Sequence, residues 1–496
     1  MSLIRGLGKD ALIYGVGSAL SPLVRLITAP ILTRVFSPGD YGVIALVQLA
    51  ISFAILFAGM NVGSAIGYFY YHYETEPQRR TVLTAGLLLL LGFSLSVSLI
   101  FAASAPAIAQ LLQLRAAEPI VGYELPLYLQ IGSIGMFGGI LSTGLQSILR
   151  VLKKPLHFLL IEGLVLVSHV GTIILFVPVW DLGIAGVFWA GAVSPSLGIC
   201  FGLLILRKHL ALPVSLSVVP AMLGYALPQV PAALINWFQN QLGRVALNYF
   251  ATLSELGLFS IAFSLASMIL MVNMAFRLAY DPFSMSVMKS SNAVDIYSRV
   301  YTWFTFAFGC LLGIVIFGAR PVLQILTPVE YHEAYSLILW LAISGFYMGA
   351  NNILATGIWI TRNTIYTSYA QLVTFAFVAV STLTLVPMFG ALGAALGMVI
   401  GAVAQSVAYY FFSQRFYFVP YRFLSTHIAV LLIALTGVLL NTLIEDAALG
   451  SSILIGLPIL FIVPIICYLI ILRDSERSIL QRSLRSLVRG EWKNLV

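Results

Sequence analysis

Arg25 is the residue whose type and position most clearly suggest chemistry. It lies fifteen residues after Asp10 in an apolar stretch, so on a helix it stands about 22 Å from Asp10, close to the middle of a bilayer. An arginine at that depth costs about 2.5 to 3.5 kcal/mol and is expected to face protein or a wet cavity. We interpret Arg25 as an anion site suited to phosphate. The alternative is that it caps backbone carbonyls freed by Pro22 and Pro30.

A cluster of amide side chains occupies the corresponding stretch of the seventh predicted helix. It offers neutral hydrogen-bonding groups where the first helix offers a cation, and its members are Asn236, Gln239, Asn240 and Gln241. We predict that the two helix faces line one cavity. Polar side chains within a membrane also serve simply to join neighbouring helices, and that structural role is the alternative.

Three further ionisable residues are candidates for this cavity. Glu162 and His169 are seven residues apart on the fifth predicted helix, nearly on one face, where they could relay protons or bind a coupling cation. Alternatively, neighbouring helices neutralise each of them. Arg277, near the cytoplasmic end of the eighth predicted helix, is expected to reach the cavity mouth and to bind diphosphate together with Arg25. Snorkelling to the membrane surface explains Arg277 equally well.

The sequence shows no pattern for catalysis, cofactor binding or metal binding. It has no GxxxxGK[ST] loop for ATP phosphates, no DxD and no HExxH, and its cysteines, Cys200, Cys310 and Cys467, are far apart. We therefore expect no enzyme activity, no cofactor and no metal. Any energy input is expected to come from an ion gradient or from the substrate's own gradient.

Composition places these residues in a membrane protein. Apolar residues make up 60% of the 496 residues and charged residues only 9%, with a mean hydropathy of +1.00. Soluble domains carry about 25% charged residues, so a soluble enzyme, a secreted module and a disordered chain are excluded. The net charge of +8 does not indicate nucleic acid, because the basic residues do not cluster with aromatic residues on a soluble face.

Apolar runs long enough to cross the hydrocarbon core recur along the chain. They predict an all-α polytopic membrane protein with fourteen transmembrane helices. The expected spans are residues 10–35, 41–70, 81–105, 125–150, 155–178, 183–206, 220–249, 255–280, 298–320, 333–360, 364–388, 391–414, 424–444 and 451–472.

The distribution of Lys and Arg predicts the orientation, because basic residues are retained on the cytoplasmic side. With the N-terminus inside, 21 of the 26 basic residues are cytoplasmic, and the outer side keeps Arg34, Arg115, Arg244 and Arg320. Both termini are therefore predicted to be cytoplasmic, in the cell inner membrane. The tail after Leu472 has arginines and leucines at helical spacing and is predicted to lie on the inner leaflet. A solvated tail is the alternative.

An internal repeat divides the chain. Leu-Gly-x-Ala at 182–185 and Gly-Ala-Val at 191–193 recur 210 residues later at 392–395 and 401–403, and Asp40-Tyr41-Gly42 resembles Glu255-Leu256-Gly257. Six helices per unit give a parallel repeat around a central cavity. We expect an N-lobe at 1–212, a C-lobe at 213–418, two C-terminal helices at 419–472 and a basic amphipathic tail at 473–496.

Several short motifs carry a resemblance to a known family. They are Gly8-Lys9-x-Ala11, Pro30-x-Leu32-x-Arg34 followed by Ser37-Pro38-x-Asp40-Tyr41-Gly42, and Glu330-Tyr331-x-x-Ala334. Over nearly its whole length the chain resembles the Wzx-type polysaccharide flippases of the multidrug/oligosaccharidyl-lipid/polysaccharide exporter superfamily. The resemblance implies two six-helix lobes, alternating access and a polyprenyl-diphosphate-linked oligosaccharide as cargo. It also implies cationic cavity residues for the diphosphate. Arg25 best suits that role, and a two-arginine clamp would need Arg277 or Arg244. With an oligosaccharide in the cargo, we expect the amides to contact sugar, namely Asn236, Gln239, Asn240 and Gln241.

The expected function is therefore flipping of a lipid-linked oligosaccharide from the cytoplasmic to the outer leaflet for cell-surface polysaccharide synthesis. The expected partners are this substrate, membrane lipids and glycan-assembly proteins, with no nucleic acid. Two alternatives belong to the same superfamily: a cation-coupled multidrug exporter and a flippase for the peptidoglycan lipid precursor. A membrane glycan polymerase or ligase is the alternative from a different class.

Overall fold

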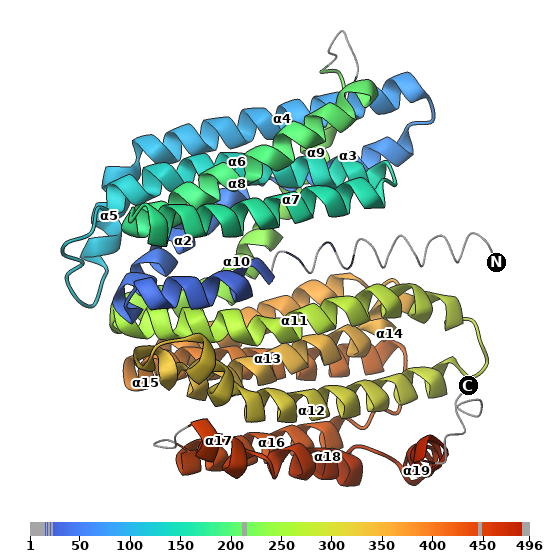
Figure 1. The fold of residues 1–496 in the computed structure, drawn as a ribbon. Helices are drawn as coiled ribbons and strands as arrows, with labels where there is room; N and C mark the ends of the chain where they lie inside the picture. The colour runs from blue at the N-terminus through green and yellow to red at the C-terminus, as the bar shows by residue number, and fades with distance from the viewer. Residues whose placement is uncertain are drawn as a thin grey trace.

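The computed structural model describes residues 23–210, 216–444 and 449–488, together with Gly15, Gly17 and Leu20. It is all-helical, with 88% helix, and the described residues form no strand. Figure 1 shows long helices that run roughly parallel to one another and form two bundles, one above the other in this view. The predicted fold class is confirmed. The first predicted helix is described only in part, as helical residues 23–35.

The first bundle, here the N-bundle, consists of residues 23–35 and the helices up to α9. α2 to α8 pack on one another, and α9 packs on α3 and α4. The helices are α2 (Pro38–Gly59), α3 (Val62–His72), α4 (Glu76–Ala103), α5 (Ala105–Leu114), α6 (Leu125–Val151), α7 (Pro155–Ile174) with its π-helical end η1 (Leu175–Val179), α8 (Gly183–Leu206), η2 (Arg207–His209) and α9 (Val219–Ala226). The short helix α5 was not predicted and occupies the first part of the outer loop expected between residues 105 and 125.

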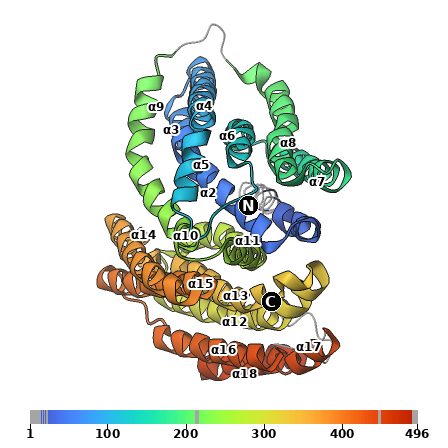
Figure 2. The ribbon, with the colours of Figure 1, turned by 90° about the vertical axis from the view of Figure 1, so that its left-hand side faces the viewer.

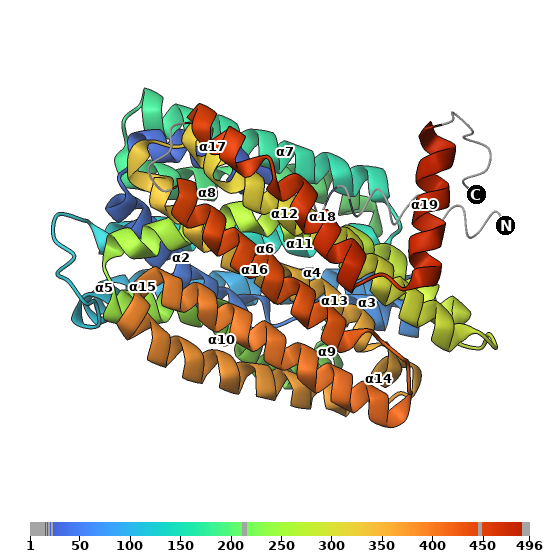
Figure 3. The ribbon, with the colours of Figure 1, turned by 90° about the horizontal axis from the view of Figure 1, so that it is seen from below.

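The second bundle, here the C-bundle, extends from α10 to α15, and α16 to α18 cover its outer side (Figure 3). A short 3-10 turn, η3 (Leu227–Gln229), connects it to α9. Its helices are α10 (Val230–Phe250), α11 (Leu253–Val287), α12 (Ala293–Leu326), η4 (Val329–Ala334), α13 (Tyr335–Leu354), α14 (Thr356–Ile360) and α15 (Ile365–Phe416), followed by α16 (Phe423–Ile444), α17 (Leu449–Gly456) and α18 (Ile459–Ile470).

Eleven helical segments of the described residues are long and apolar enough to cross a membrane. One of them, α15, contains two of the expected spans, because Gly390 has φ 52° and ψ −128° and interrupts the helix. Gly397 lies against Thr382 and Gly401 against Val378, so the two halves pack as an antiparallel hairpin. A positive φ at the turn favours glycine, which has no Cβ to clash. The total of fourteen helices stays a prediction.

The two bundles meet at the end of the molecule that carries α5, which is the predicted outer end (Figure 2). Gly42 of α2 lies against Leu253, and Gly257 of α11 lies against Pro38, so closely that a Cβ on either glycine would overlap backbone atoms. These glycines close the Asp40-Tyr41-Gly42 and Glu255-Leu256-Gly257 motifs. The related motifs of the two halves thus form a reciprocal contact between the bundles.

Further hydrogen bonds join the bundles at this same end. Tyr331 Oη donates to Phe36 O over 2.7 Å, and Glu118 Oε1 accepts from Leu253 N over 2.8 Å. Close by, Tyr123 Oη donates to Asp40 Oδ1 over 2.8 Å. Burial, together with this bond, raises the pKa of Tyr123 to about 12, so the phenol remains a donor at neutral pH.

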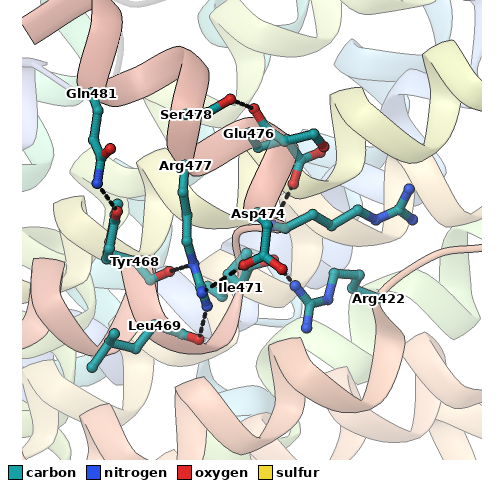
Figure 4. Close-up of polar contacts among 11 residues, drawn as sticks. Arg422, Tyr468, Leu469, Ile471, Asp474, Glu476, Arg477, Ser478 and Gln481 are labelled. Atoms are coloured by element: carbon teal, nitrogen blue, oxygen red, sulfur yellow. Dashed lines mark hydrogen bonds and ion pairs between the residues drawn. The ribbon is translucent and has the colours of Figure 1, made fainter.

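The basic tail is helical from Asp474 to Val488 (α19), and this helix turns across the direction of the bundles (Figure 3). Figure 4 shows how its start is held. Arg477 donates to the carbonyls of Tyr468 and Leu469, and Arg422 donates to that of Ile471. Cations at the C-terminus of α18 donate hydrogen bonds to its free carbonyls and interact favourably with the negative end of its dipole. Arg477 therefore anchors the tail to the protein.

Candidate functional site

α10 is the shared wall of three spaces in the structure. A cavity of about 1180 Å³ lies on the side of the N-bundle, and a cavity of about 790 Å³ lies within the C-bundle. We call them the N-cavity and the C-cavity. A third space, an apolar groove, lies along another face of α10. Because successive residues of a helix point about 100° apart, side chains that are adjacent on α10 enter different spaces.

The N-cavity brings Arg25 and Arg244 together. Both residues line it together with Tyr41, and the charge of Arg25 acts on Arg244. The Arg25 side chain is exposed to this space, and among the described residues no hydrogen-bond acceptor engages its guanidinium. Two cations that share a cavity repel each other, so a dianionic ligand between them would relieve that repulsion.

Arg244 is held in place by its neighbours on α10 and α11. It donates to Gln241 Oε1 and, over 3.4 Å, to Ser260 Oγ, and it lies 4.7 Å from the ring centre of Phe263. The charge distribution assigned Arg244 to the outer side, and α10 ends at Phe250, close to the expected end of this span at residue 249. Six further residues put Arg244 about 9 Å inside the helix end.

Gln241 was predicted to contact sugar in the same cavity as the other three amides. The structure places it in the N-cavity, bonded to Arg244, whereas Asn236, Gln239 and Asn240 line the C-cavity. The packing of α10 between α2 and α15 sets this rotation. Arg25 therefore shares its cavity with only one of the four predicted amides.

Two more basic residues of the cavity come from the N-bundle. Arg150, near the end of α6, and His169 on α7 both line the N-cavity, and His169 Nδ1 lies 3.1 Å from Ser194 Oγ. Glu162 is half-buried on α7 and does not line the N-cavity. The described lining residues of this cavity include no carboxylate.

The C-cavity is rich in amides. Asn240 donates to Asn236 Oδ1 over 2.8 Å, and Gln239 donates to Gln371 O over 2.6 Å. Arg277 also lines this cavity and forms an ion pair with Asp281 at 3.3 Å. Arg277 and Arg25 therefore lie in different cavities and do not form one diphosphate site. Further amides that the sequence did not reveal as site residues are Asn351, Asn352, Gln371 and Gln405. The sequence feature that could have identified them is the presence of polar amides within apolar spans.

Comparisons with known proteins agree with this architecture. Residues 31–276 match the model of a family described as polysaccharide biosynthesis protein. The fold is similar to that of MurJ, a lipid II flippase in an inward closed conformation, with a TM-score of 0.68 and 13% identity. That match covers 93% of this chain and 98% of MurJ. No curated protein matches the sequence.

Two multidrug transporters have a similar fold. An inward-facing MATE family transporter gives a TM-score of 0.64 at 14% identity, covering 79% of this chain and 94% of that chain. The Vibrio cholerae MATE transporter VcmN in its bent form gives 0.56 at 15% identity, covering 84% and 97%.

The fold is thus that of the two-lobed membrane transporters represented by MurJ and the MATE proteins. The match to the polysaccharide biosynthesis family over residues 31–276 agrees with the resemblance that the sequence motifs carry.

Proposed function

We propose that the protein moves a polyprenyl-diphosphate-linked oligosaccharide from the cytoplasmic to the outer leaflet by alternating access, for cell-surface polysaccharide synthesis. The observation that carries this proposal is the pairing of Arg25 with Arg244 in the N-cavity. A diphosphate has two adjacent anionic groups, and arginine binds phosphate through several N–H donors at once. Arg150 adds a third cation along the same cavity.

The C-cavity supplies the complementary chemistry for sugar. Sugar hydroxyl groups both donate and accept hydrogen bonds, and an amide side chain offers both functions without a charge. Asn236, Gln239 and Asn240 face this space from α10, the helix that also carries Arg244. A diphosphate held on one side of α10 would therefore leave its glycan within reach of the amides. Arg277 would contact the glycan rather than the diphosphate.

The closed contacts at the predicted outer end correspond to an inward-facing state. In this state the head of the substrate enters from the cytoplasmic side, and separation of Gly42 from Leu253 and of Gly257 from Pro38 would open the outer side. We place the protein in the cell inner membrane with both termini in the cytoplasm, where membrane lipids and glycan-assembly proteins would be its partners.

His169 is our candidate for coupling to a proton gradient. It lies at the wall of the N-cavity, where a change of its charge would alter the field at a bound diphosphate. Glu162, two helical turns earlier on α7, could exchange protons with it only through other groups. Coupling by this pair remains a proposal.

The structural relatives suggest two other cargoes. The charges of the N-cavity disfavour one of them, a cationic drug, and suit the other, a lipid-linked peptidoglycan precursor. A multidrug exporter of cationic compounds would need carboxylates, whereas the described lining of this cavity has three arginines and no carboxylate. MurJ is named a lipid II flippase, and a lipid-linked peptidoglycan precursor would also suit a cationic cavity. A polymerase or ligase would instead require groups that activate an acceptor.

The test is export of lipid-linked glycan in cells whose own flippase has been removed. We expect Arg25→Ala and Arg25→Glu to reduce export at least tenfold and Arg25→Lys to retain part of it, because lysine keeps the charge without the planar donor set. Arg34→Ala is the matched control, since Arg34 is an exposed arginine of the same helix outside the cavity. Normal export by Arg25→Ala at normal protein level would remove the anion role.

A further inference from the structure

The third face of α10 borders an apolar groove of about 810 Å³, whose other walls are α2, α4 and α5. Aliphatic and aromatic side chains form most of its lining, including Leu46, Phe53, Ile100 and Leu111. Ile100 and Leu111 are 66% and 56% exposed, so the groove is open along its length. It extends from the middle of α2 toward the predicted outer end.

The two ends of the groove differ in chemistry. At the inner end, Trp237 of α10 packs against Phe53 of α2, with ring centres 5.0 Å apart. At the outer end, Arg115 lies 6.0 Å from the ring centre of Tyr249 and is the charged residue of the lining.

A thin wall separates the groove from the N-cavity. Leu49 lines both spaces. Ser52 lines the N-cavity and accepts a hydrogen bond of 3.0 Å from Trp237 Nε1, and Trp237 itself lines the groove. One hydrogen bond between α2 and α10 thus lies between an apolar channel and a cavity that contains Arg25 and Arg244.

We propose that this groove holds the isoprenoid chain of the lipid-linked substrate while its head occupies the N-cavity. The inference rests on the proposed function and adds the site for the tail. Burial of a methyl-branched hydrocarbon against Phe53, Leu111 and Trp237 is favourable, and it would hold the tail beside the head at the seam between the bundles. Bilayer acyl chains touch every outer face of the protein, whereas this apolar groove shares Leu49 with the cationic cavity.

The experiment uses the full-length protein in liposomes and a polyprenyl diphosphate with a photoreactive benzophenone on its chain. We expect crosslinks on α2, α4, α5 and α10, and at least a fivefold loss of crosslinking and of glycan-lipid transport in Ile100→Trp, which fills the groove. Leu99→Trp is the matched control, because Leu99 is 61% exposed on the same helix but lies outside the groove. Leu111→Trp provides a second filled groove if Ile100→Trp does not fold.

The outcomes separate this inference from the proposed function. If the filled-groove variants transport normally while Arg25→Ala does not, the groove assignment is wrong and the function stands. If phosphatidylglycerol competes for the crosslinks as well as unlabelled polyprenyl diphosphate does, the groove holds ordinary acyl chains and the assignment is again overturned. Loss of crosslinking in the filled-groove variants, with Leu99→Trp unchanged and only polyprenyl diphosphate competing, supports it.

Discussion

Two arginines from different helices line the N-cavity, and they are held differently. Arg244 is fixed by Gln241, Ser260 and the ring of Phe263, whereas Arg25 is exposed to the cavity and engages no acceptor among the described residues. A fixed guanidinium loses little entropy when it binds an anion, and a mobile one can adjust to the second phosphate. We infer that Arg244 defines the position of the diphosphate and that Arg25 closes on it.

Gln241 should act as a positioning residue for Arg244. Gln241→Leu removes the acceptor of the Arg244 guanidinium, and a hydrogen bond to a charged group is worth about 1.5 to 3 kcal/mol. We expect binding of a prenyl diphosphate to weaken about tenfold and binding of a prenyl monophosphate to change less. Calorimetric titration of the purified protein measures both. Gln113→Leu, an exposed change on α5, should bind as the unchanged protein does, and equal binding by Gln241→Leu would contradict the positioning role.

At the scale of the helices, the reciprocal contact of α2 and α11 closes the outer end. Each helix begins with an N-cap, Ser37 or Thr252, whose side-chain oxygen accepts from the backbone three residues later, so the two helix starts have the same geometry. Gly42 and Gly257 then let the backbones approach, as small residues commonly do where membrane helices pack closely. The seal is therefore a property of the repeated sequence motif.

Gly257→Ala should open this seal. Its Cβ would overlap the carbonyl of Pro38, so the inward-facing state loses stability relative to a state in which the bundles separate there. In a chain without its native cysteines, we expect Ser264→Cys in the N-cavity to react several-fold faster with an impermeant maleimide added outside. Gly92→Ala is the control, since a Cβ there meets nothing within 4 Å. An unchanged labelling rate in Gly257→Ala would show that the contact does not control access.

At the scale of the molecule, the two bundles behave as bodies that meet at one end and share α10 as a wall. α9 packs on the N-bundle and α10 on α15, so the seventh predicted span crosses from one bundle to the other through the Pro228-containing turn η3. Movement of the bundles would strain that turn and rearrange the walls of both cavities together. Alternating access then requires the outer contacts to break in every transport cycle.

A disulfide across the outer end should therefore stop transport. Ala117 N donates to Asn248 O over 3.0 Å, and residues so bonded have Cα atoms about 5 Å apart, within the range that a disulfide spans. We expect the double variant Ala117→Cys/Asn248→Cys, without native cysteines, to lose glycan-lipid transport when oxidised and to regain it with reductant. Each single variant should ignore the oxidant. Undiminished transport by the oxidised double variant would mean that the bundles do not separate at this end.

Apolar run length predicted the helices well, because the bilayer thickness sets the length of each span. The hairpin at Gly390 was predicted as two spans, and α8 matches the expected 183–206. Arg25 stood out because a mid-membrane cation is costly. Arg244 did not, since only the packing of α10 brings it into the same cavity as Arg25. The division of the α10 amides between two cavities depends on helix rotation, which distant contacts of α10 with α2 and α15 decide.

The most direct test of the central claim is equilibrium binding of a short-chain prenyl diphosphate to the purified protein. The account predicts that Arg25→Ala weakens binding at least tenfold, that Arg34→Ala leaves it unchanged, and that a prenyl monophosphate loses much less affinity than the diphosphate, because two cations match two anionic groups. Equal affinity of the unchanged protein and Arg25→Ala for the diphosphate would contradict the account.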